Sequence, residues 1–222
     1  MMNGIKMENF NFSREEMLDH LPRGKCAEIG VARGEYSREI IRRNPEMLYL
    51  IDAYANFELG NDRKDSNMVE DDHHQLRYEN VYREYFNYKN VKIVRSKSIY
   101  ASRIFPFEYF DWIYIDADHS YKGCYNDLVA YDKVVKSNGI ICGHDFHPKY
   151  RRKAGFEVNE AVEDFVKERN YILLGSTNED KWKSFIIVKN DKTKEDFLNS
   201  IYHNQKLTPG VIKTENGLLK MN

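Results

Sequence analysis

The sequence predicts a doubly wound α/β domain, in which helices cover both faces of a mostly parallel sheet. Short apolar runs alternate with amphipathic segments through most of the 222 residues. This alternation is typical of strand–helix–strand units with right-handed crossovers. The last two apolar runs, 171–174 and 185–188, are joined by a polar loop, so we expect them to close the sheet as an antiparallel pair.

The elements can be placed in order along the chain. Ser13 and Glu16 form a capping box, so a short helix should run to about residue 20. Ser120 is a candidate cap for a helix with an apolar stripe over 121–132. Further helices are expected from residue 35 up to a stop at 44–45, after residue 75, and over 159–169 and 194–202. The predicted buried strands are 26–29, 47–51, 91–94, 111–116 and 140–142, the last one following a turn at 137–139.

Composition narrows the classes of function. The formal net charge is -1, with 34 basic and 35 acidic residues, and a dedicated nucleic-acid binder normally carries a basic excess. We therefore expect a small-molecule partner and no nucleic acid. The three cysteines, Cys26, Cys124 and Cys142, are too scattered for a disulfide framework or a CxxC metal site.

No secretory signal stands at residues 1–10, and no apolar segment approaches the roughly 20 residues of a membrane span. The expected location is therefore cytoplasmic, with no membrane partner. The sequence leaves open whether the chain acts alone or as a homo-oligomer.

A glycine loop follows the first long strand and opens a helix. Gly30 permits a tight turn, and Gly34 permits close approach of a ligand. Asp52 ends the next strand 22 residues after Gly30, about where an acid that binds ribose hydroxyls belongs in a nucleoside-binding sheet. A plain glycine turn and a strand-end turn acid are the alternative interpretations.

Three residues beyond these strands are candidates for the adenine end of such a site. Tyr54 could stack on adenine or pack as a surface tyrosine. Ser96 and Ser98 could frame the base or cap the following helix.

Acidic and histidine side chains follow the next two strands. Asp116, His144 and Asp145 could share a divalent cation, with the oxygen ligands favouring magnesium and the imidazole favouring manganese, iron or zinc. His119 can accept a proton near neutral pH and is the candidate general base. Asp118 is more simply explained as a helix-start acid.

The pattern E-x-G-x-x-x-G, the strand-end Asp52, the stretches I-D-A-D-H-S-Y and N-G-I-I-C-G-H-D-F and the closing strand pair occur together over about 24–190. The combination resembles the class I S-adenosylmethionine-dependent methyltransferases, and within them the branch of macrolide-sugar and related small-molecule O-methyltransferases. The stretch 111–146 is the most specific part. The resemblance implies a Rossmann-like sheet of seven strands, S-adenosyl-L-methionine as the cofactor, and methylation of a hydroxyl on a sugar or sugar-containing metabolite.

The resemblance also implies roles for individual residues. Glu28, Gly30, Gly34 and Asp52 would line the cofactor site. Asp116 and Asp145 would hold a metal, Mg²⁺ or Mn²⁺, and His119 would be the general base. Position 144 departs from the pattern, because the metal-dependent sugar enzymes carry a glutamate where this chain has His144.

The whole chain, 1–222, is expected to form one domain with a core over 24–190 and a tail over 191–222. The polar stretch 55–75 could be a lid over the acceptor or a solvated insertion. The basic loop at 147–155 could meet an anionic acceptor or simply be hydrated surface. A nicotinamide-dependent dehydrogenase is disfavoured because G-x-G-x-x-G is missing. An N- or RNA-directed methyltransferase and a non-catalytic nucleoside-binding protein remain as alternatives.

Overall fold

The computed structural model describes residues 7–56, 70–147 and 157–205, together with the backbone of 211–214 and 217–220. An eight-stranded sheet lies at its centre, with the strand order β1-β7-β8-β6-β5-β2-β3-β4. The strands are β1 (Glu8–Asn9), β2 (Lys25–Ile29), β3 (Met47–Asp52), β4 (Val91–Arg95), β5 (Phe110–Ile115), β6 (Val135–Phe146), β7 (Ile172–Ser176) and β8 (Lys183–Val188).

Strand directions confirm the predicted fold class. Five adjacent strands are parallel to one another, namely β6, β5, β2, β3 and β4. Strand β8 is antiparallel to both of its neighbours, β6 and β7. The sheet has one strand more than the seven expected, because the two-residue β1 pairs in parallel with β7.

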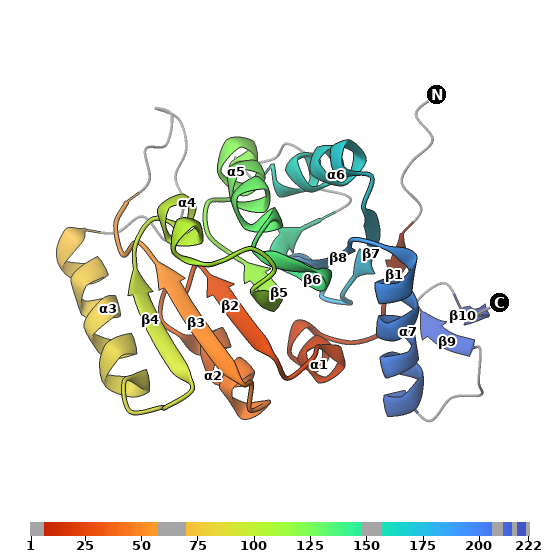
Figure 1. Ribbon diagram of the computed structural model, residues 1–222, viewed down its shortest axis with the longest axis horizontal. Helices are drawn as coiled ribbons and strands as arrows, with labels where there is room; N and C mark the ends of the chain where they lie inside the picture. Colours follow the sequence, from red (N-terminus) through yellow and green to blue (C-terminus); the bar gives the residue numbers. More distant parts are fainter. Residues whose placement is uncertain (1–6, 57–69, 148–156, 206–210, 215–216, 221–222) are drawn as a thin grey trace.

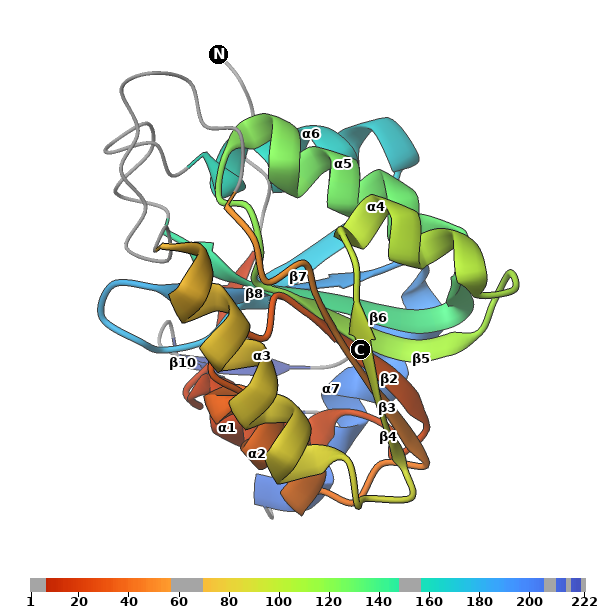
Figure 2. The same cartoon turned by 90° about the vertical axis from the view of Figure 1, so that its left-hand side faces the viewer.

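Helices cover both faces of the sheet (Figures 1 and 2). Helices α1, α2, α3 and α7 lie on one face, and α4, α5 and α6 lie on the other. Each face buries its own apolar cluster, so the sheet separates two core layers. The helices are α1 (Arg14–Met17), α2 (Glu35–Arg42), α3 (Asp71–Tyr85), α4 (Ser98–Ala101), α5 (Tyr121–Asp132), α6 (Val158–Arg169) and α7 (Asp191–Gln205).

Both predicted helix caps are present. Ser13 accepts from the backbone N–H of Glu16 while the Glu16 side chain accepts from the Ser13 N–H, and the Ser120 side chain accepts from Gly123 N. In the described parts of the chain, we find no helix with the length and apolar character to cross a bilayer.

Several boundaries differ from the expectation. Helix α3 begins at Asp71, so the last residues of the polar stretch 55–75 are helical, while 57–69 lie outside the described residues. Of the basic loop, 148–155 also lie outside them. The tail after α7 carries a two-stranded hairpin, β9 (Val211–Thr214) and β10 (Gly217–Lys220), which the sequence pattern did not indicate.

Strand β6 is much longer than the predicted 140–142. The expected turn at 137–139 is an interruption in its pairing with β5, between the pairs Phe110↔Val135 and Trp112↔Ile140. A second irregularity occurs against β8 between Gly143 and Phe146, where Asp145 has a left-handed backbone with φ 57°. Such a bulge interrupts the alternation of side chains between the two faces of a strand. Neighbouring residues 144 and 145 can therefore face the same site.

Candidate functional site

A cavity of about 410 Å³ lies beyond the carboxyl ends of β2, β3 and β5. Open parallel sheets bind ligands at this edge, and the volume is within the usual range for small-molecule sites. The residues that line it include six from five segments of the chain: Gly30, Asp52, Tyr54, Ser98, Asp116 and Asp127. The first five were candidates from the sequence, and the structure brings them to one cavity.

Gly30 explains why the E-x-G pattern occurs at this position. Its backbone has φ 90°, and a Cβ added there would lie 1.9 Å from the carbonyl oxygen of Asp116. The turn after β2 therefore packs directly against the end of β5, which only glycine permits. This contact places the glycine loop beside Asp116.

Two other residues of this motif do not line the cavity. Gly34 is the N-cap residue directly before α2 and has φ 75°. Its carbonyl oxygen accepts a 2.7 Å hydrogen bond from the Tyr85 hydroxyl. Glu28 is buried beneath the loop, where its carboxyl group accepts from the Ser37 hydroxyl. Burial raises the pKa of Glu28 to about 8, so this carboxyl is mostly protonated at neutral pH.

Asp52 organises the loops around the cavity. One carboxylate oxygen accepts from the backbone N–H groups of Val31 and Ala32, at 2.8 and 2.9 Å. The other accepts from Tyr54 N at 2.7 Å. A carboxylate has about four acceptor positions, so capacity remains for a ligand hydroxyl.

Tyr54 lies in a strained backbone conformation, with φ 47°. Its side chain is 3% exposed and packs edge-on against Tyr78. Within the part of the chain that the structure describes, the Tyr54 hydroxyl has no hydrogen-bond partner. Strain and an unpaired buried polar group commonly occur at binding sites.

The two candidate serines differ in their surroundings. Ser98 lines the cavity, and its hydroxyl donates to the carboxyl group of Asp127. Ser96 is not among the lining residues, and its hydroxyl donates to the carbonyl oxygen of Lys97.

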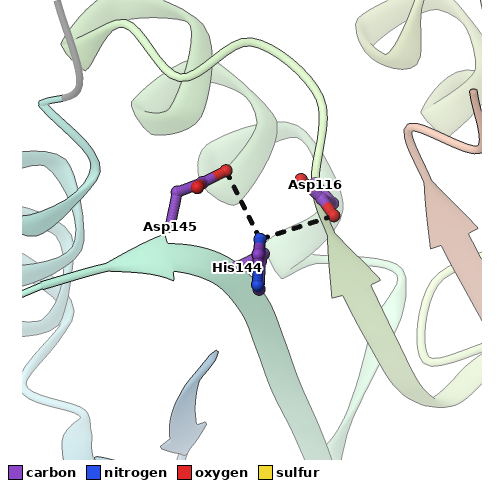
Figure 3. A group of neighbouring side chains, drawn as sticks. All are labelled: Asp116, His144 and Asp145. Atoms are coloured by element: carbon purple, nitrogen blue, oxygen red, sulfur yellow. Dashed lines mark ion pairs between the residues drawn. The ribbon is translucent and has the colours of Figure 1, made fainter. Parts of the chain in front are cut away.

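A cluster of acidic and histidine side chains lies at the ends of β5 and β6, and Figure 3 shows three of its members, Asp116, His144 and Asp145. The His119 Nε2 atom lies 2.8 Å from Asp145 Oδ2 and 3.5 Å from Asp116 Oδ1. The His144 Nδ1 atom lies 3.5 Å from Asp145 Oδ2 and 3.7 Å from Asp116 Oδ2. We call Asp116, His119, His144 and Asp145 the acid–histidine cluster. Asp116 belongs both to this cluster and to the cavity wall.

The contacts in the cluster favour a negative charge on its aspartates and a positive charge on its histidines. Burial alone would raise the pKa of Asp145, but hydrogen bonds and charge from His119 and His144 hold it well below its ordinary value. Burial alone would lower the pKa of His144, yet Asp145 and Asp116 raise it. Asp145 is therefore anionic at neutral pH, which suits either an imidazole base or a bound cation.

The donor set also fits a divalent metal. One ligand atom from each of Asp116, His144 and Asp145 lies within 4.8 Å of the other two. Two carboxylates and an imidazole are common ligands of such ions, and the imidazole is better suited to Mn²⁺ than to Mg²⁺.

Three residues near the site were not individual candidates from the sequence, although His74 belongs to the candidate lid 55–75. Asp127 is 3% exposed on α5, and burial raises its pKa to about 7. An acid within the apolar stripe of a helix is a signal that could have identified it. His74 lines the cavity and lies 2.9 Å from the side-chain oxygen of Asn56. Arg14 reaches Asp116 from α1, and no local pattern could have indicated that contact.

Comparison with known proteins gives the class. The sequence matches the family model described as a methyltransferase domain over residues 27–146, which is more than half of the chain. The chain therefore belongs to this family and contains its methyltransferase domain. The matched stretch contains the glycine loop, Asp52 and the whole acid–histidine cluster.

Solved structures show the same fold at low sequence identity. Spermidine synthase from Thermotoga maritima is 15% identical, with a TM-score of 0.54 over 86% of this chain and 61% of that one. The N-methyltransferase NodS from Bradyrhizobium japonicum WM9 is 12% identical, with a TM-score of 0.54 over 78% of this chain and 93% of that one. An O-methyltransferase family protein from Burkholderia thailandensis is 9% identical, with a TM-score of 0.55 over 79% and 55%.

These likenesses establish the fold alone. This chain spans only 61% of the length of the two spermidine synthase chains it matches. A search of curated proteins finds no match to the sequence.

Proposed function

We propose that this enzyme transfers the methyl group of S-adenosylmethionine to a hydroxyl oxygen of a small molecule, such as a sugar or sugar-containing metabolite. The observation that carries the proposal is the position of Asp116. It lines the cavity and also lies 3.5 Å from the candidate base His119. Cofactor and acceptor oxygen would therefore meet at this residue.

The cavity residues would hold the adenosyl group. Asp52 has acceptor capacity for a ribose hydroxyl, and Tyr54 offers a ring for stacking on adenine. Ser98 stands with Asp127 on the wall formed by α4 and α5. Glu28, Gly34 and Ser96 would support these loops without touching the ligand.

In the reaction, the acceptor oxygen attacks the methyl carbon while the carbon–sulfur bond breaks. Because the sulfonium methyl is already electrophilic, the protein must chiefly align oxygen, carbon and sulfur. His119 would take the hydroxyl proton, and Asp145, 2.8 Å away, would stabilise the imidazolium that forms. S-adenosylhomocysteine and the methyl ether are the products.

Asp116, His144 and Asp145 would hold a divalent cation if the enzyme uses one. A bound cation would supply an electrophile that lowers the pKa of the acceptor hydroxyl. The two histidines would then have separate tasks, with His119 as the base and His144 as a ligand.

The described ends of the candidate lid, 55–56 and 70–75, are proposed to lie beside the acceptor. Asn56 and His74 lie near the two ends of this stretch. Both line the cavity and their side chains are hydrogen-bonded to each other, which supports a position beside the ligand. Residues 24–190 would form the methyltransferase core and 191–222 a tail.

Calorimetry with S-adenosylhomocysteine tests the cofactor assignment. We expect one site per chain, weakened about 10- to 100-fold by Asp52→Ala, because a charge-assisted hydrogen bond to ribose is lost. Asp196→Ala, at an exposed ion pair on α7, is the matched control and should bind normally. A folded wild-type chain that does not bind this ligand would remove the cofactor proposal.

A methyl-transfer screen tests the acceptor class. The enzyme would be given methyl-labelled S-adenosylmethionine and panels of hydroxylated sugars, amines and RNA, in chelator and with Mn²⁺ or Mg²⁺. Label on sugar hydroxyls is the expected result. Label found only on amines or RNA would overturn O-methylation, and equal turnover in chelator would remove the metal.

A further inference from the structure

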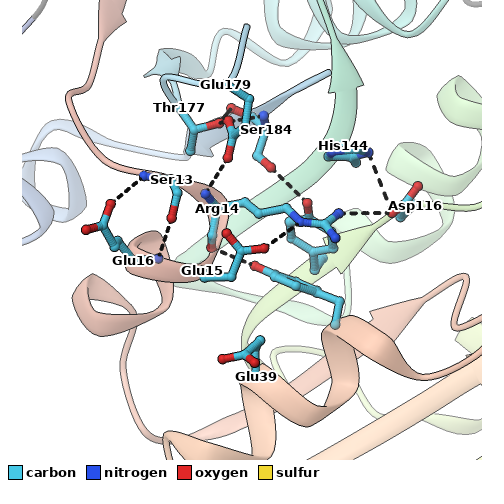
Figure 4. A network of polar contacts seen from close by, with 12 residues as sticks. Ser13, Arg14, Glu15, Glu16, Glu39, Asp116, His144, Thr177, Glu179 and Ser184 are labelled. Atoms are coloured by element: carbon cyan, nitrogen blue, oxygen red, sulfur yellow. Dashed lines mark hydrogen bonds and ion pairs between the residues drawn. The ribbon is translucent and has the colours of Figure 1, made fainter. Parts of the chain in front are cut away.

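An arginine from outside the family match reaches the acid–histidine cluster. Arg14 lies on α1, whereas the match begins at residue 27. Figure 4 shows its side chain extending to Asp116, whose carboxylate also pairs with His144. The Arg14 Nη1 atom lies 3.9 Å from Asp116 Oδ2.

Arg14 is held from several directions, so its position is well defined. Its backbone N–H donates to Glu179 at 2.5 Å, and its Nε donates to Glu15 at 3.1 Å. The guanidinium lies over the ring of Tyr36, 4.8 Å from the centroid, while the Tyr36 hydroxyl donates to the Arg14 carbonyl at 3.0 Å. A group fixed in this way loses little conformational entropy when it binds a ligand.

The guanidinium retains binding capacity. Its side chain is 25% exposed, and 3.9 Å is too long for a hydrogen bond to Asp116. Burial would lower the pKa of Arg14, but Tyr114, Glu15 and Asp116 raise it overall, so the charge is permanent. A planar, permanently charged donor with free N–H groups is suited to a carboxylate.

The position of Arg14 relative to the cavity indicates which carboxylate. The ribose-binding candidate Asp52 and Asp116 both lie on the cavity wall. Arg14 is not a lining residue, but its Nη1 atom lies 3.9 Å from Oδ2 of Asp116. A ligand with adenosine at one end of a flexible chain and an amino acid at the other would extend from the cavity in this direction.

We propose that Arg14 binds the carboxylate of the amino-acid end of the cofactor, so that the amino-terminal segment completes a site begun by the methyltransferase core. The proposal rests on the proposed function. It makes Arg14 a binding residue that distinguishes whole cofactor from its adenosine fragment.

Two probes separate these parts of the ligand. S-adenosylhomocysteine contains the amino-acid carboxylate, whereas 5′-methylthioadenosine has the same adenosine and sulfur without it. Calorimetry on the full chain should show that Arg14→Gln weakens S-adenosylhomocysteine roughly 10- to 100-fold. The same variant should bind 5′-methylthioadenosine within about threefold of wild type. Arg14→Lys should restore part of the loss, since it keeps the charge but not the planar donor pair.

Controls address folding and the rival cations. Arg38→Gln removes an exposed arginine that pairs with Glu84 and should leave both affinities unchanged. Lys122 lines the cavity itself, so Lys122→Gln tests the opposite orientation of the ligand. A loss confined to S-adenosylhomocysteine in Lys122→Gln would overturn the proposal.

Other outcomes are equally decisive. Equal losses for both probes in Arg14→Gln would indicate a structural role, and no loss for either would also remove the assignment. If wild type binds neither probe, the proposed function fails. If wild type binds both and Arg14→Gln behaves like wild type, only the inference about Arg14 fails.

Discussion

The cavity and the acid–histidine cluster both bury carboxyl groups, but they favour opposite protonation states. Burial raises the pKa of Glu28 to about 8 beneath the cavity and that of Asp127 to about 7 on its wall. In the cluster, the neighbouring imidazoles of His119 and His144 hold the pKa of Asp145 below its ordinary value despite similar burial. The difference lies in the partners, because Glu28 and Asp127 each have a serine hydroxyl where Asp145 has two histidines.

This difference suits the two halves of the proposed reaction. A protonated Glu28 avoids placing an uncompensated buried charge beneath the loop that would meet the nucleoside. An anionic cluster stabilises an imidazolium or a cation near the acceptor oxygen. Each prediction below tests one side of the comparison.

The largest effect is expected in the cluster. His119→Ala should lower turnover by about 10²- to 10⁴-fold, because the acceptor proton loses its base. Affinity for S-adenosylhomocysteine should stay near wild type, since His119 does not line the cavity. Steady-state kinetics and calorimetry measure the two quantities, with the exposed His203→Ala as the control. Unchanged turnover would transfer the role of base to another group.

Asp145→Asn should destabilise the fold by about 3 kcal/mol at neutral pH, because it leaves buried histidines without their counter-charge. The folded-state pKa of Asp145 is lowered, so its stabilisation is present above the unfolded-state pKa and is lost as the pH falls. Urea unfolding in chelator should therefore show the gap between wild type and variant closing towards acidic pH. A gap that does not depend on pH would contradict the ionised state.

Glu28→Gln should show the opposite pH dependence. The folded-state pKa is raised to about 8, so wild-type Glu28 costs stability as the pH rises from its unfolded-state pKa towards that value. The variant should gain on the order of 3 kcal/mol relative to wild type between about pH 5 and pH 8. Parallel unfolding curves for the two proteins would mean that the carboxyl is ionised when buried.

The smallest effect is expected at Tyr54. Tyr54→Phe removes a buried hydroxyl that has no partner among the described residues, so the ligand-free protein should gain up to about 1 kcal/mol. If the ring stacks on adenine, Phe should keep affinity for S-adenosylhomocysteine within about threefold, and Tyr54→Ala should lose roughly tenfold. Thermal unfolding and calorimetry test both statements. A large loss in the Phe variant would instead assign a ligand contact to the hydroxyl.

Much of the fold could be predicted because its signals are local. The capping box at Ser13, the Ser120 cap and the buried strand ending at Asp52 each follow from a few adjacent residues. Parallel topology then brings the strand ends together, so Asp116 and Asp145 could be placed in one region before the contacts were known.

The remainder depends on contacts between distant parts of the chain. Strand β1 has two residues and exists only through its pairing with β7. The bulge at Asp145 depends on pairing with β8, and it explains how His144 and Asp145 can both approach Asp116. Asp127 is a different case, since an acid on the buried face of α5 is a local signal in the sequence itself.

The anchoring of Arg14 has a consequence for the order of assembly during synthesis. Its backbone bonds to Glu179, 165 residues later in the chain. At about 5–20 residues per second, ribosomal synthesis of that stretch takes on the order of 10–30 s. The first charged group of the site to leave the ribosome is therefore among the last to be fixed in place. A nascent chain could complete the central parallel strands while this guanidinium still lacks its anchor on the β7–β8 connection.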